Sequence, residues 1–85
     1  MKVEESEVVI LARDLPKYGL RARDIGTVVE VYPGGSLEVE FLKASGETQA
    51  LLRLTTRDIR KIDESDVLST RRLTRAGKSY TRSKL

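Results

Sequence analysis

Within residues 36–42, apolar and acidic residues alternate without a break from Leu37 to Phe41. Leu37, Val39 and Phe41 share one parity, and the two glutamates between them share the other. Successive side chains of a β-strand point to opposite faces, so this parity buries the three apolar groups and leaves the glutamates in water. An α-helix would spread the same three side chains around its axis. The segment therefore predicts a strand from a sheet with one buried face.

Four other short segments, rich in β-branched or aliphatic residues, also predict strands. They are residues 7–13, 27–32, 48–54 and 59–62. Tight turns are expected at residues 33–35 and 44–47, where glycines accept the positive φ that such turns require. Residues 55–58 supply hydroxyl and carboxylate side chains suited to one short helical turn.

The strand pattern also predicts which side chains share the interior. In the second strand we expect Val29 and Val31 to point inward. In the fourth strand the inward residues are Ala50, Leu52 and Leu54. Five short strands with tight turns favour an all-β fold, a small five-stranded SH3-like barrel, because closing the sheet removes exposed edges.

Composition restricts the chemistry of this domain. The 85 residues include no cysteine and no histidine, so disulfides, thiolate nucleophiles, ordinary zinc sites and imidazole catalysis are excluded. No phosphate loop or catalytic set of side chains is present in the sequence. We therefore expect no enzyme activity, no cofactor and no metal.

Charge divides the chain into parts. Residues 1–65 carry a net charge of −2, while residues 66–85 carry +5. Sparse apolar residues after residue 65 favour disorder. We expect an N-terminal extension (1–6), an SH3-like β-barrel domain (7–64) and a disordered, flexible basic tail (65–85).

Hydropathy gives an expectation about location. The longest apolar run, residues 8–12, is far shorter than the roughly 18 residues that cross a bilayer, and the first residues lack the plan of a signal peptide. A cytoplasmic protein without membrane contact is the expectation.

The sequence shows two resemblances, one to a known family and one to a known motif. The segments 8–11, 14–20, 24–32 and 37–41 resemble the DUF4926 family of small bacterial proteins over roughly residues 7–62. That resemblance implies an SH3-like barrel and carries no established activity. Residues 24–31 are also similar to the KOW motif, which implies binding of RNA or DNA.

The long first loop, residues 14–24, is the first candidate for partner binding, because apolar and cationic side chains lie together there. The candidate residues are Leu15, Pro16, Lys17, Tyr18, Arg21 and Arg23. The alternative is that Leu15 and Leu20 close one end of the interior and Tyr18 packs over them.

The basic tail is the second candidate. Its candidate residues are Arg71, Arg72, Arg75, Lys78, Tyr80, Arg82 and Lys84. The cations could contact phosphates or an acidic protein partner, and Tyr80 could stack on a base. A solvated end that only aids solubility is the alternative.

Two functions follow as hypotheses. The first is a non-catalytic protein-interaction module that offers its first loop and an open strand edge to an unidentified protein partner, for example as an antitoxin or immunity protein. The second is a KOW-like nucleic-acid-binding protein that uses the basic tail and the first loop.

Overall fold

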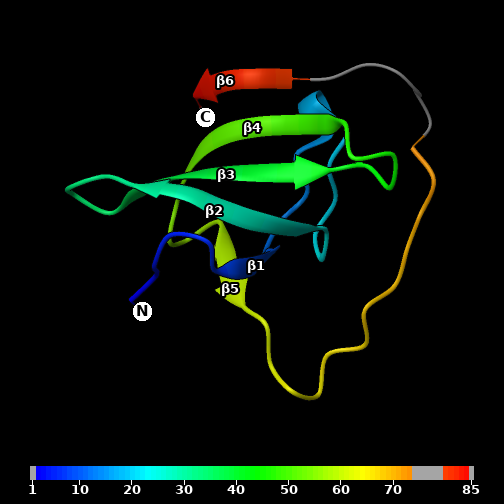
Figure 1. The fold of residues 1–85 in the computed structure, drawn as a ribbon, viewed down its shortest axis with the longest axis horizontal. Coiled ribbons are helices and arrows are strands. Elements are labelled where there is room, and N and C mark those ends of the chain that lie inside the picture. The colour runs from blue at the N-terminus through cyan, green and yellow to red at the C-terminus, as the bar shows by residue number, and fades with distance from the viewer. Residues whose placement is uncertain (1, 74–79, 85) are drawn as a thin grey trace.

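The computed structural model describes residues 2–73 and, for residues 80–84, the backbone. Its elements are β1 (Val8–Leu11), the 3₁₀-helix η1 (Pro16–Tyr18), β2 (Ile25–Val31), β3 (Ser36–Leu42), β4 (Thr48–Thr55), β5 (Ile59–Lys61) and β6 (Tyr80–Lys84). All strands lie in one sheet of order β5-β1-β2-β3-β4-β6 (Figure 1). The prediction of an all-β fold is confirmed.

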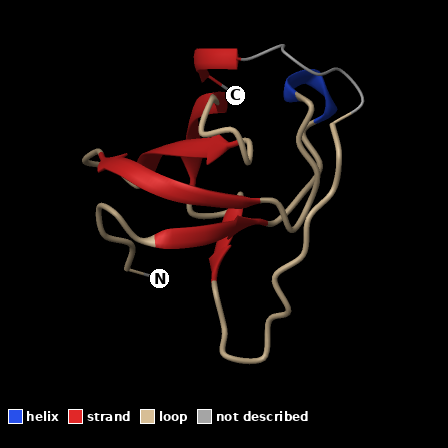
Figure 2. Cartoon of the chain, turned by 45° about the vertical axis from the view of Figure 1, so that its right-hand side comes forward, coloured by secondary structure: helices blue, strands red, loops and turns tan. Residues whose placement is uncertain are grey.

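The first five strands form antiparallel pairs, and β6 pairs with β4 in parallel. β5 lies at one edge of the sheet and β6 at the other, and within the described residues no ladder joins them. The sheet is twisted but open (Figure 2). The prediction of a closed barrel is therefore not confirmed.

The alternation in β3 has the predicted result. Leu37, Val39 and Phe41 are buried, whereas the glutamates between them are partly exposed. The three residues predicted to point inward from β4, which are Ala50, Leu52 and Leu54, also belong to the core. The core cluster comprises Val3, Val9, Leu11, Leu15, Tyr18, Leu20, Val28, Leu37, Val39, Phe41, Ala50, Leu52, Leu54 and Ile59.

Both predicted core positions in β2 are wrong. Val28 is 1% exposed, whereas Val29 is 45% exposed and Val31 is 38% exposed. The cause is a β-bulge: Val28 pairs with Val39, but Glu30 pairs with the next residue of β3. A bulge places two residues opposite one and breaks the period of two. Val29 is the extra residue, and Val31 lies exposed at the strand end.

The connection from β4 to β5 is a tight turn instead of the predicted helical turn. The backbone N–H of Asp58 donates to the carbonyl of Thr55 at 3.0 Å. The Asp58 carboxylate in turn accepts the Thr55 N–H at 2.9 Å and the Arg13 Nε at 2.7 Å. Asp58 is 8% exposed, so this carboxylate joins the turn to the segment that follows β1.

These contacts predict a pH dependence of stability. Burial raises the pKa of Asp58, but hydrogen bonds from Thr55 and Arg13 outweigh burial and lower the pKa overall. Because the folded pKa lies below the unfolded value of about 3.9, the stabilisation is present above that value and is lost as pH falls through the folded pKa.

Asp58→Asn should therefore cost about 1–3 kcal/mol at pH 7, and the difference from the wild type should shrink as the pH falls below about 4. Urea unfolding at several pH values measures this. The matched control is Glu64→Gln at an exposed position. A cost for Asp58→Asn that stays constant with pH would contradict the assignment.

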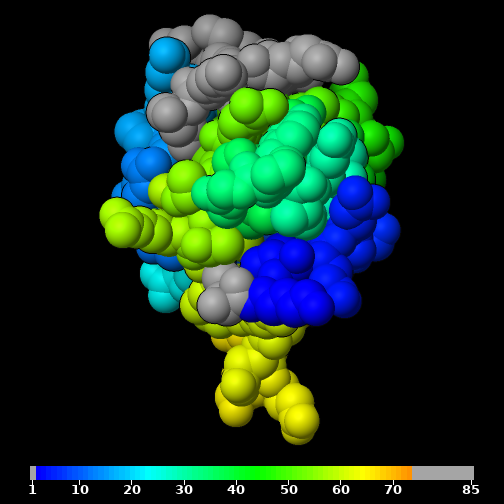
Figure 3. Space-filling model, turned by 90° about the vertical axis from the view of Figure 1, so that its left-hand side faces the viewer, coloured from blue at the N-terminus to red at the C-terminus, as the bar shows by residue number. Residues whose placement is uncertain are grey.

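The segment after β5 begins with an ion pair to that strand. The Arg60 guanidinium binds both oxygens of Asp66 at 2.9 and 2.8 Å, and this hydrogen bonding, together with the Asp63 N–H, lowers the pKa of Asp66 to about 2. The first residues of this segment project from the body of the domain (Figure 3, yellow). The chain then returns along the molecule, and Tyr80–Lys84 forms β6 beside β4 (Figure 1).

Candidate functional site: the first loop and the C-terminal segment

The first loop folds back on itself between β1 and β2. Leu15 and Leu20 form an isolated β-bridge with reciprocal backbone hydrogen bonds of 3.0 and 3.1 Å. Between them lies η1, which ends at Gly19 in the left-handed region with φ of 69°. A residue without Cβ adopts this φ without strain. The bridge turns the side chains of Leu15, Tyr18 and Leu20 into the core, where all three are buried.

This burial agrees with the alternative in which the apolar loop residues belong to the interior and do not contact a partner. Leu15 and Tyr18 were candidates for partner contact, but their side chains are not on the surface. The physical reason is that a small domain uses most of its large apolar groups to build the core. The backbone carbonyl of Tyr18 accepts a hydrogen bond from the buried Gln49 side chain at 3.1 Å, which fixes η1 against β4.

The other four loop candidates are exposed: Pro16, Lys17, Arg21 and Arg23. The Lys17 ammonium lies 5.5 Å from the centre of the Tyr18 ring. Arg23 has a φ of 80° and donates its backbone N–H to the Leu11 carbonyl at 2.7 Å. The loop therefore presents three cations on a rigid frame, and their role in partner binding stays a prediction.

Arg71 joins the C-terminal segment to this loop. Its Nε donates to Asp24 Oδ1 at 2.9 Å, and its Nη2 donates to Asp24 Oδ2 and, at 2.9 Å, to the Gly19 carbonyl. The hydrogen bond and charge of Asp24 raise the pKa of Arg71. The side chains of Arg71 and Asp24 are 28% and 19% exposed. The structure thus brings one tail candidate into contact with the loop.

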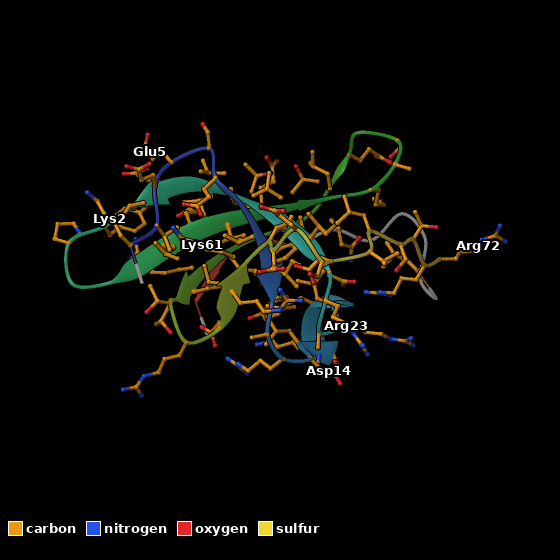
Figure 4. All side chains as sticks on the ribbon, turned by 90° about the horizontal axis from the view of Figure 1, so that it is seen from below. Lys2, Glu5, Asp14, Arg23, Lys61 and Arg72 are labelled. Atoms are coloured by element: carbon orange, nitrogen blue, oxygen red, sulfur yellow. The ribbon has the colours of Figure 1, made fainter. Side chains whose placement is uncertain are left out.

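The remaining tail candidates are placed only in part. Arg72 is exposed and points away from the body of the domain (Figure 4). Tyr80, Arg82 and Lys84 belong to β6, of which the backbone is described. Arg75 and Lys78 lie outside the described residues.

A groove of about 580 Å³ lies where the first loop, the β3–β4 hairpin and residues 69–73 meet. Leu20 and Phe41 line it as buried residues, and Ile25 and Leu42 line it as exposed apolar residues. Gln49 also lines the groove, and its Oε1 is buried without a hydrogen-bond partner among the described residues. A buried acceptor of this kind can take an N–H donor.

The β4 edge is the second surface that the structure places beside the C-terminal segment. In the parallel ladder Ala50 pairs with Tyr80, Leu51 with Thr81, Leu52 with Ser83 and Arg53 with Lys84. This surface consists of backbone N–H and C=O groups, which hydrogen-bond to an extended chain regardless of its side chains. Sequence reasoning named an open strand edge but gave no signal that the tail would lie on it.

Within the described part of the chain, no three carboxylate, histidine or cysteine side chains group together as a metal site would require. A membrane-spanning helix of sufficient length and apolar character is likewise not found among the described residues. The described residues present three candidate surfaces: a strand edge, a groove and an ion-paired loop.

Comparison with protein families matched a domain of unknown function, DUF4926, over residues 5–61. Comparison with curated proteins and with solved structures gave no match. The matched region contains β1 to β5 and the whole first loop, and it ends at the last residue of β5. It covers about two thirds of the chain, and the chain belongs to the DUF4926 family.

Proposed function

We propose that the chain is a non-catalytic protein-interaction module of SH3-like type that binds an extended segment of a partner along the β4 edge. An antitoxin or immunity protein would be one module of this kind. The observation that carries the proposal is the parallel pairing of β6 with β4. β6 lies outside the family match. In the family domain itself, residues 5–61, β4 is therefore an edge strand of the sheet.

Strand addition at a sheet edge is a common mode of peptide recognition. Backbone hydrogen bonds give affinity, and side chains at alternate positions give specificity. β4 is the longest strand of the sheet, at 8 residues, and its inward face contributes three residues to the core. A rigid strand of this kind binds a partner without the entropic cost of ordering the receiving surface.

The test uses the full chain with β6 disabled. Thr81→Pro combined with Arg82→Pro removes the backbone N–H groups of two adjacent residues. Because successive N–H groups of a strand point to opposite sides, one of the two removed groups faces β4. We expect amide exchange in β4 to rise roughly tenfold or more, since exchange follows the free energy of local opening. A labelled peptide with the sequence of residues 78–85 should then bind to the variant and not to the wild type.

The matched control is Thr81→Ala combined with Arg82→Ala, which makes the same change of charge and keeps both backbone donors. It should retain slow exchange in β4 and exclude the peptide. Unchanged β4 exchange in the proline variant, or no peptide binding by that variant, would rule out the β4 edge as the binding surface.

A second function, KOW-like binding of RNA or DNA, is favoured by one specific observation. The exposed Arg72 follows Arg71, which contacts the first loop, and it lines the same groove as the exposed loop cation Arg23. In Figure 4 Arg23 and Arg72 lie toward one end of the molecule, and Lys2 and Lys61 lie toward the other. Clustered cations are the electrostatic signature of phosphate binding.

Titration with mixed RNA and DNA at low and raised salt tests this function. Arg23→Gln with Arg72→Gln should lower the slope of log K against log salt by about 1–2. Lys2→Gln with Lys61→Gln removes the same charge from the opposite end and should leave the slope unchanged. If the wild type does not bind at low salt, the nucleic-acid function is excluded.

A further inference from the structure

The contacts of Arg71 hold the C-terminal segment against the first loop, and they also define a binding site for a guanidinium group. Three acceptors converge on one guanidinium: both carboxylate oxygens of Asp24 and the carbonyl of Gly19. Bidentate contact between guanidinium and carboxylate is stronger and more directional than a single ion pair. We refer to these three acceptors as the guanidinium slot.

The slot is built entirely by residues of the first loop. The backbone N–H of Arg21 donates to Asp24 Oδ2 at 2.8 Å and so orients the carboxylate. The Asp24 backbone is fixed as well, because its carbonyl accepts the Leu11 N–H at 2.8 Å. The N–H of Gly19 donates to the Pro16 carbonyl at 3.1 Å, which holds the Gly19 carbonyl in position.

The slot and its occupant come from different parts of the chain. Gly19 and Asp24 lie inside the family match, whereas Arg71 lies ten residues beyond its end. The loop therefore holds its acceptors by contacts within the family domain, and the guanidinium is supplied from outside that domain. We propose that the first loop of this domain is an arginine-binding site, occupied here by Arg71 and able to receive an arginine from an extended partner segment.

The geometry selects arginine over lysine. A guanidinium presents several N–H donors in one plane, and two of its nitrogens here meet three acceptors. An ammonium is a compact charge that cannot reproduce this planar arrangement. Asp14 adds to the negative potential felt by Arg71, which further favours a cation.

The groove beside the slot indicates what flanks the arginine. Ile25 and Leu42 are exposed apolar residues that line the groove together with Arg71 and Leu73. Leu73 follows Arg71 by two residues, and its side chain is half-buried. The partner segment should therefore carry an apolar residue near its arginine.

The experiment empties the slot in the full chain and offers it an arginine in solution. The protein is Arg71→Ala, and the probe is a blocked peptide with the sequence of residues 69–73. We expect amide NMR signals of Gly19, Arg21 and Asp24 to shift on titration. A peptide with lysine at the position of Arg71 should bind at least tenfold more weakly, because it loses the bidentate contact.

Three matched proteins complete the test. Arg72→Ala has the same change of charge but keeps Arg71, so its filled slot should not bind the peptide. Arg71→Ala with Asp24→Asn should lose binding. Arg71→Lys in the full chain should show loop amide signals that are shifted from those of the wild type, and this comparison keeps the test valid if the alanine variant does not fold.

Equal binding of the arginine and lysine peptides, or binding that survives Asp24→Asn, would overturn the proposal. So would wild-type-like loop signals in Arg71→Lys. The outcome is separable from that for the β4 edge, because the slot is read on the loop amides and strand addition is read on the β4 amides.

Discussion

Replacing Phe41 with alanine is expected to lower the free energy of unfolding by about 3–5 kcal/mol. Phe41 is 2% exposed and belongs to the core cluster. Its ring is the only phenylalanine ring in the chain, so its loss removes a large share of the apolar area of a small core. Urea unfolding measured by circular dichroism gives the free energy and the m-value together.

Leu42→Ala is the matched control for Phe41→Ala. Leu42 is the next residue of β3 and is 54% exposed, so its truncation should change the free energy of unfolding by less than about 0.5 kcal/mol. A similar cost for both substitutions would mean that β3 does not present alternate residues to the core, and the assignment of its two faces would fail.

The strands were predictable because their patterns are local. The parity of β3 depends on seven consecutive residues, and period-two burial follows from strand geometry alone. The glycine-containing turns on either side of β3 are equally local, since each requires only a residue that accepts positive φ. Such features need no knowledge of which segments meet.

Features that depend on pairing partners were not predictable. The bulge at Val29 results from the register between β2 and β3, and the sequence of β2 alone contains three consecutive β-branched residues that fit either parity. A one-residue change of register moves every side chain beyond it to the other face. The exposure of Val29 therefore becomes visible only when the ladder is known.

The same limit applies to the candidate site. The two basic segments were recognisable from composition, but the contact between Arg71 and Asp24 spans 47 residues. Nothing local to Arg71 distinguishes it from Arg72, which points away from the body of the domain (Figure 4). Asp24 was not among the candidate residues, and its role as the acceptor follows from the turn that orients it.

Gly26→Ala is the second substitution with a large expected effect. Gly26 is buried in β2, and an added Cβ would lie 2.7 Å from Val39 Cγ1 and 2.8 Å from Phe41 Cε2. Close packing of the β3 side chains therefore excludes a larger residue at this position. Overpacking at such a site costs about 1–3 kcal/mol, and Gly26→Val should cost more than Gly26→Ala.

A double-mutant cycle separates overpacking from an intrinsic preference of the backbone for glycine. In the Phe41→Ala background the ring atoms nearest the new Cβ are gone, and Val39 can move into the vacated space. Gly26→Ala should then cost less by roughly 0.5–3 kcal/mol, the range for residues in direct contact. Additive costs in the cycle would show that the glycine is required for its backbone conformation and not for the space that Phe41 occupies.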